Sequence, residues 1–165
     1  MKRKILAGLI LVMMLCALTG LSAQADWSPE VSFSTVDQYG ITRTESIFQN
    51  ARLTMLNLWA CWDDACVKEL PTLQLLAANY AGDLQIYGVS LADYEEDNVQ
   101  TMNDMGVYLP LLQLTDSLNG LLNTGYIPAA VFVDSNGYIV SDVQVCSRSY
   151  DEWSTIVSDL LANME

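Results

Sequence analysis

The chain has 165 residues, among them 20 acidic and seven basic residues, four cysteines and no histidine. Without histidine the chain cannot form a Ser-His-Asp triad, a histidine-activated nucleophile or the usual zinc and copper ligand sets. Its excess of acidic residues would repel phosphate, so nucleic acid is excluded as a partner. The length suits one domain.

The N-terminus has the pattern of a secretory signal peptide. Lys2, Arg3 and Lys4 precede an apolar run from Ile5 to Leu18, and a small-x-small cleavage site follows at 23–25. We predict a leader over residues 1–25 and one domain over 26–165, exported to an extracytoplasmic space. An uncleaved leader acting as a membrane anchor is the alternative. Cleavage leaves four basic and 20 acidic residues, a net charge of −16.

The first elements are predicted from periodicity. Residues 31–36 alternate between apolar and polar, which predicts a strand with one buried face. A turn at 37–40 and a partner strand at 41–44 would complete a β-hairpin, and 45–52 forms a short irregular or helical link. The apolar run 53–59 predicts a central strand covered on both faces.

A long helix is predicted after Trp62. Asp63 stands where an N-cap residue is favoured, and Asp64 and Glu69 suit the positive end of the helix dipole. The helical pattern continues to about Tyr80, with a kink expected at Pro71.

The rest of the chain alternates strands and helices. Strands are predicted at 84–91, 109–114, 129–134 and 138–140, and helices at 95–105, 117–122 and 150–164. This order predicts an α/β fold in which a central mixed β-sheet carries helices on both faces, with the hairpin N-terminal to it.

Two stretches resemble a known family. Leu58-Trp59-Ala60-x-Trp62 followed by Cys66 and Lys68-Glu69-Leu70-Pro71, together with the stretch 126–140, resembles the TlpA/ResA-like branch of the thioredoxin superfamily. The match runs from about Val31 to Leu161. It implies a thioredoxin-like fold and thiol-disulfide oxidoreductase activity, without a cofactor.

The family's chemistry rests on a Cys-x-x-Cys at a helix start, where the dipole and free N–H groups stabilise the first thiolate. Here Cys66 matches the second, resolving position, and Asp63 occupies the attacking position. Asp63 cannot replace a thiolate, and its charge should disfavour a Cys66 thiolate. Cys66 is therefore expected to be a poor attacking thiol.

Two further cysteines complicate this picture. Cys61 forms a C-x4-C unit with Cys66 that could serve as an alternative redox pair, if the two Cα atoms approach within about 7 Å. Cys146 stands where the family commonly has glycine, which implies a place near the helix start. A structural bridge from Cys146 to Cys61 or Cys66, a Cys61/Cys66 pair, and three independent thiols remain open.

The resemblance also assigns a binding groove. Pro128 would be a cis-proline, with Ile127 before it, beside which an extended substrate peptide pairs; an ordinary trans proline is the alternative. Trp62 would form an exposed rim and Trp59 part of the core. Glu69, which tunes the cysteine pair in the family, could here simply serve the helix start.

Three functions follow. The first is an exported thiol-disulfide oxidoreductase that uses Cys61 and Cys66, with protein thiol or disulfide substrates or a membrane electron donor as partners. The second is a non-catalytic thioredoxin-fold binding module with structural cysteines. The third, capture of a soft metal by thiolates, is disfavoured because the chain lacks histidine; we predict no metal site.

Overall fold

The computed structural model describes residues 30–91, 95–122 and 124–164. The predicted signal peptide therefore lies outside the described residues. Within these ranges, no helix has both the length and the apolar character needed to cross a membrane.

A five-stranded mixed sheet forms the centre of the domain, with strand order β5-β4-β3-β6-β7. Strand β3 (Leu53–Trp59) pairs in parallel with β4 (Leu84–Ser90), which pairs in parallel with β5 (Leu111–Gln113). On its other side, β3 pairs antiparallel with β6 (Ala129–Asp134), and β6 pairs antiparallel with β7 (Gln144–Val145). All seven residues of β3 are buried, as its apolar sequence predicts.

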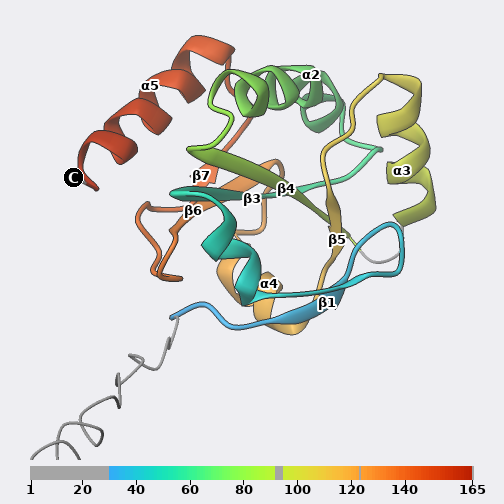
Figure 1. Cartoon of the computed structure of the whole chain (residues 1–165). Coiled ribbons are helices and arrows are strands. Elements are labelled where there is room, and N and C mark those ends of the chain that lie inside the picture. Colours follow the sequence, from blue (N-terminus) through green and yellow to red (C-terminus); the bar gives the residue numbers. More distant parts are fainter. Residues whose placement is uncertain (1–29, 92–94, 123, 165) are drawn as a thin grey trace, which may run out of the picture.

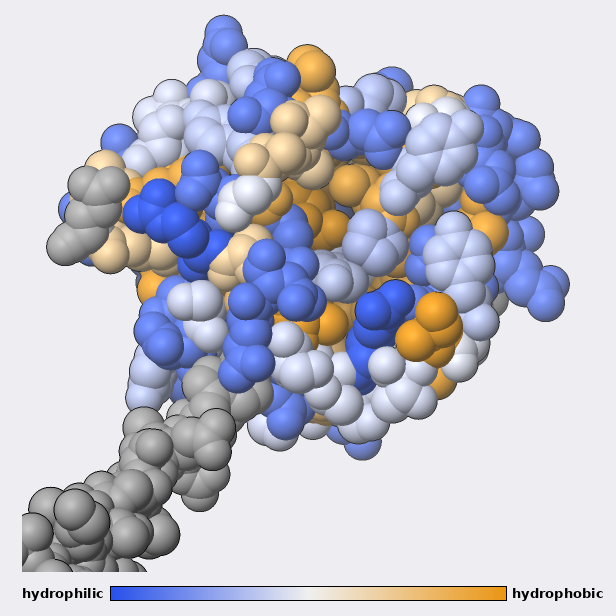
Figure 2. All heavy atoms as spheres, in the orientation of Figure 1, coloured by the Kyte–Doolittle hydropathy of each residue, from blue (hydrophilic) through white to orange (hydrophobic). Residues whose placement is uncertain are grey.

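Helices cover both faces of this sheet (Figure 1). One face packs against α2 (Asp64–Asn79), α3 (Glu95–Asp104) and α5 (Tyr150–Ala162). The other packs against α4 (Asp116–Leu122) and the 3-10 helix η2 (Glu45–Asn50). The predicted α/β architecture is thus confirmed. Figure 2 shows hydrophilic residues gathered over α3, at the right edge of this view.

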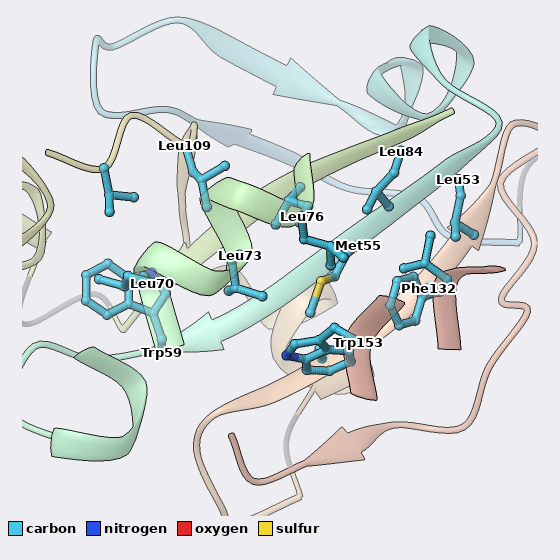
Figure 3. Close-up of a cluster of buried hydrophobic side chains, with 14 of the residues drawn as sticks. Leu53, Met55, Trp59, Leu70, Leu73, Leu76, Leu84, Leu109, Phe132 and Trp153 are labelled. Carbon is cyan, nitrogen blue, oxygen red and sulfur yellow. The ribbon is translucent and has the colours of Figure 1, made fainter. Parts of the chain in front are cut away.

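The core under α2 and α5 contains the two largest buried side chains, Trp59 and Trp153 (Figure 3). The ring of Trp153 meets Phe132 of β6 edge-on, with 6.0 Å between the ring centroids. Trp59 lies so close to Gly88 of β4 that a Cβ there would come within 2.8 Å of its indole Nε1. Position 88 therefore requires glycine.

The N-terminal hairpin, β1 (Ser34–Val36) and β2 (Thr42–Thr44), lies along the free edge of β5. The Thr35 hydroxyl donates to the Gln113 carbonyl at 2.7 Å. At the hairpin tip, the buried Asp37 carboxylate accepts from the Arg43 guanidinium at 2.8 Å. The hairpin is confirmed, and it covers an edge that would otherwise expose unpaired backbone groups.

The predicted strand at 138–140 is wrong, because only one isolated bridge forms there, between Val133 and Ile139. The Phe132 N–H donates to the Ser141 hydroxyl at 3.0 Å, so a side chain takes the place of a ladder carbonyl and the pairing stops. The next strand of the sheet is β7. Pro71 lies inside α2, which continues to Asn79.

Candidate functional site

The start of α2 is capped by Asp63. Its backbone is extended, with φ −101° and ψ 116°, and its Oδ1 accepts the Cys66 N–H at 2.9 Å. This confirms the predicted N-cap. It also shows that the position where the family pattern has its attacking thiol is occupied by a carboxylate already bound to the helix end.

Cys66 lies one turn into the helix and is only 1 % exposed. Burial raises the pKa of its thiol to about 12, with hydrogen bonding to Asp63 and the charges of Asp63 and Glu69 adding to the rise, while a backbone hydrogen bond from Ala60 opposes it. The expected poor thiolate is confirmed, but the main cause is loss of water rather than the acidic neighbours. Cys66 is therefore unsuited to attacking a substrate disulfide first.

Cys61 is half-buried in the loop between β3 and α2. Its backbone N–H donates to Oδ1 of Asn98 at 2.6 Å, and the Asn98 Nδ2 donates to the Ser90 hydroxyl, also at 2.6 Å. Asn98 is completely buried in α3. A buried side-chain amide thus fixes the backbone of Cys61 against the end of β4.

Glu69 lies on the buried face of α2 and is 3 % exposed. Its Oε1 accepts the backbone N–H of Arg148 at 2.7 Å and the indole N–H of Trp153 at 2.9 Å. The interpretation that it simply serves the helix start is therefore wrong: it ties α2 to α5. Its Oε2 has no hydrogen bond, although the nearby Asn57 amide favours the charged form. Burial outweighs these contacts and raises the pKa of Glu69.

Pro128 follows Ile127 through a cis peptide bond, as predicted. Its carbonyl accepts the backbone N–H of Cys146 at 3.1 Å, which places Cys146 beside the cis-proline. Cys146 is exposed and has φ 68°. This left-handed conformation favours glycine, and a cysteine there costs about 1 kcal/mol.

The loop that carries Cys146 is held by Arg148. Its Nη1 donates to the carbonyls of Val145 at 3.0 Å and Cys146 at 3.2 Å, and its guanidinium lies 5.0 Å from the ring centroid of Trp153. Since the Arg148 N–H also binds Glu69, this loop is anchored beside the start of α2. No simple sequence signal indicated a role for Arg148 or Asn98, because each bonds to a residue that is far from it in the sequence.

A groove lies beside the cis-proline, with a cavity of about 210 Å³. Trp62 and Ile127 line it together with Leu58, Leu91 and Tyr126. Trp62 is 57 % exposed and Trp59 is buried, which confirms the predicted rim and core roles. An apolar groove next to an extended segment suits an extended peptide chain.

Cys61, Cys66 and Cys146 are all present as free thiols. Cys61 and Cys66 contact the same core cluster, and Cys146 reaches the helix start through Arg148 and Glu69. In the described part of the chain, no group of three or more cysteine or acidic side chains is placed to hold a metal ion.

Comparison with known proteins agrees with this geometry. No protein-family model matches the chain. The chain is 25 % identical over 169 residues to the thioredoxin-like protein YneN of Bacillus subtilis, covering 92 % of this chain and 95 % of that protein. It is 33 % identical over 92 residues to the thiol-disulfide oxidoreductase ResA of Oceanobacillus iheyensis, covering 54 % and 48 %.

Among solved structures, MTB DsbF, determined in mixed oxidised and reduced forms, matches with a TM-score of 0.67 and 27 % identity, over 79 % of this chain and 96 % of that one. The fold and the cis-proline site therefore define a thioredoxin-like protein. Within that superfamily, the chain is similar in sequence to thiol-disulfide oxidoreductases of the ResA type.

Proposed function

We propose that this chain is an exported thiol-disulfide exchange protein in which Cys61 attacks and Cys66 resolves. The observation that carries the proposal is the contrast between the two thiols. Cys61 is partly accessible in a loop at the helix start, whereas Cys66 is buried in the first turns of the helix, with a pKa of about 12. Attacking and resolving cysteines differ in this way.

The exchange would proceed in two steps. The Cys61 thiolate attacks one sulfur of a substrate disulfide, which forms a mixed disulfide and releases the other substrate sulfur as a thiolate. The Cys66 thiolate then attacks the Cys61 sulfur, so that a Cys61–Cys66 disulfide forms and the second substrate thiolate leaves. The substrate gains two electrons and the protein loses them.

The second step should be slow. With a pKa of about 12, only about one Cys66 thiol in 10⁵ is deprotonated at pH 7. The mixed disulfide would therefore persist longer than in a relative with an ordinary Cys-x-x-Cys pair. This supports a function in which the substrate is retained as well as reduced.

The partners would be exported proteins with accessible thiols or disulfides. An extended segment of such a protein would lie in the groove formed by Trp62 and Ile127, next to Pro128. A membrane-bound thiol donor would return the oxidised pair to the dithiol form. Export rests on the sequence of residues 1–25, and recovery from the extracytoplasmic fraction of a chain that begins at Asp26 would test it.

Insulin reduction by purified protein tests the exchange. Wild type should be active, Cys61→Ser inactive, and Cys66→Ser should stop at the mixed disulfide. Cys146→Gly is the matched control, because it removes a thiol from the same region while suiting φ 68°. Activity that survives Cys61→Ser, or is lost only in Cys146→Gly, would refute the assignment.

A second function is favoured by one observation. The Asp63 carboxylate caps the helix at the attacking position, which suits a thioredoxin-fold binding module without catalysis. In that case the groove would bind its partner equally well in wild type and in a variant without cysteines. A wild-type protein that reduces insulin would exclude this alternative.

A further inference from the structure

A second hollow lies between the tip of the N-terminal hairpin and α3. Two adjoining cavities, of about 90 and 360 Å³, share Gln38 and Val99 in their walls. The half-buried Val99 and the buried Met102 and Val107 form the floor of the smaller cavity, which is bordered by Tyr39 and Tyr108. We refer to this surface as the hairpin–α3 cleft. None of the three cysteines lines it.

Exposed apolar side chains gather around this cleft. Among the described residues, eight large hydrophobic side chains are exposed, and four of them fall in the short segments 39–41 and 105–108. Tyr39 is 77 % exposed and Tyr108 76 %, with Ile41 and Met105 beside them in sequence. Exposed apolar groups that gather in this way, with a polar rim, are typical of interaction sites.

Both tyrosines stand on fixed backbone. The Tyr39 N–H donates to Oδ1 of Asp37 at 2.9 Å, and Asp37 is itself held by Arg43. The Tyr108 N–H donates to Oε1 of Gln74 on α2 at 2.8 Å, and Gln74 also binds the carbonyl of Gly106. Two aromatic rings on a rigid support lose little conformational entropy when a partner binds.

The exposed charges on the α3 side of the cleft are of one sign. Glu96, Asp97 and Asp104 are exposed on α3, where Figure 2 shows hydrophilic residues. None of the four basic residues of the described ranges lines the cleft. Arg43, on the hairpin, is paired with Asp37, and the other three contact Asp83, Asp64 and backbone carbonyls: Arg52, Lys68 and Arg148. A second copy of this chain would bring the same acidic rim and be repelled.

We propose that the hairpin–α3 cleft binds a basic segment of a partner protein. An apolar side chain of that segment would pack on Val99, between the exposed rings of Tyr39 and Tyr108. Lysine or arginine side chains beside it would lie over the faces of Tyr39 and Tyr108 and pair with the acidic rim. This binding needs no thiol chemistry, and it stands whether or not the proposed exchange reaction does.

Fluorescence anisotropy with a labelled peptide of alternating lysine and leucine tests the proposal. The wild-type protein should bind this probe, and more weakly as salt rises. The double variant Tyr39→Ser/Tyr108→Ser should weaken binding about tenfold or more, since it removes both central aromatic contacts. The matched control, Leu75→Ser/Tyr138→Ser, removes comparable exposed apolar groups elsewhere and should leave binding unchanged.

The outcomes separate the alternatives. Circular dichroism verifies that each variant is folded. Equal binding of a glutamate–leucine probe, or equal loss in the control variant, would overturn the proposal, because the contact would then be unspecific. Loss of binding in Cys61→Ser would also overturn it and assign the probe to the thiol site. The proposal would also be overturned if sedimentation showed a dimer that Tyr39→Ser/Tyr108→Ser abolishes, since the cleft would then bind a second copy of the chain.

Discussion

Replacing the capping aspartate with cysteine should restore a fast exchange site. Asp63→Cys places a thiol at the N-cap of α2, toward which the Cys66 N–H points. It also removes the hydrogen bond and the charge by which Asp63 raises the pKa of Cys66. Loss of the carboxylate cap should cost about 1 kcal/mol of stability.

The gain in rate can be estimated from thiolate populations. A cysteine at a helix N-terminus with a neighbouring cysteine has a pKa of about 7, against about 8.5 for a free one. At pH 7 this raises the thiolate fraction from about 3 % to about 50 %. Formation of the mixed disulfide, the attacking step, should therefore be about tenfold faster than in wild type, while its resolution stays limited by the buried Cys66.

The control for this variant is Asp63→Ser, which keeps a capping oxygen and removes the charge without adding a thiol. It should remain near the wild-type rate. If folded Asp63→Cys were no faster than Asp63→Ser, the groove and cis-proline would not form a competent exchange site. The assignment of the attacking role to Cys61 would then lose its structural basis.

Three further predictions follow from buried groups. Release of the second substrate thiol should accelerate about tenfold per pH unit between pH 7 and 9 in stopped-flow assays, because Cys66 titrates only near 12. Asp37→Asn should lower the free energy of unfolding by about 2 kcal/mol at pH 7, because it removes the charged hydrogen-bond acceptor of the partly exposed Arg43. That difference should shrink as the pH falls below about 4. Burial raises the pKa of Asp37, but the hydrogen bonds from the backbone and from Arg43 outweigh it, so the pKa is lowered overall. The carboxylate's contribution to stability is lost when it is protonated. Asn98→Ala should cost about 1–3 kcal/mol and speed alkylation of Cys61 by iodoacetamide, because the backbone of this loop loses its buried anchor.

Each of these has a contrary result. A release rate independent of pH would show that Cys66 does not resolve the mixed disulfide. A stability difference for Asp37→Asn that stays constant to pH 2 would contradict the lowered pKa. Unchanged alkylation of Cys61 in a destabilised Asn98→Ala variant would mean that the amide stabilises the fold without controlling the thiol.

Much of the fold could be predicted because local signals and burial agree. The fully apolar stretch 53–59 forms the central strand, and Asp63 caps the helix as its position indicates. The segment 138–140 misled because its composition suits a strand, while a hydroxyl at Ser141 ends the ladder there. The alternation of apolar and polar residues does not indicate where a side chain will replace a backbone carbonyl as hydrogen-bond acceptor.

The site was less predictable, because its partners come from distant segments. Asn98 reaches Cys61 across 37 positions, and Glu69 binds Arg148 across 79. The weak thiolate of Cys66 was expected from nearby charge, but its main cause, burial, depends on packing that no local pattern reports. Pro128 could be assigned because the resemblance supplied its context.

The central claim is that Cys61 attacks and Cys66 resolves, and covalent trapping tests it most directly. The Cys66→Ser variant is incubated with a peptide disulfide, quenched with acid and mapped by mass spectrometry. The account predicts a mixed disulfide on Cys61 that does not form when Cys61 is also replaced by serine. An adduct on Cys146 alone, or no adduct on a folded protein, would contradict it.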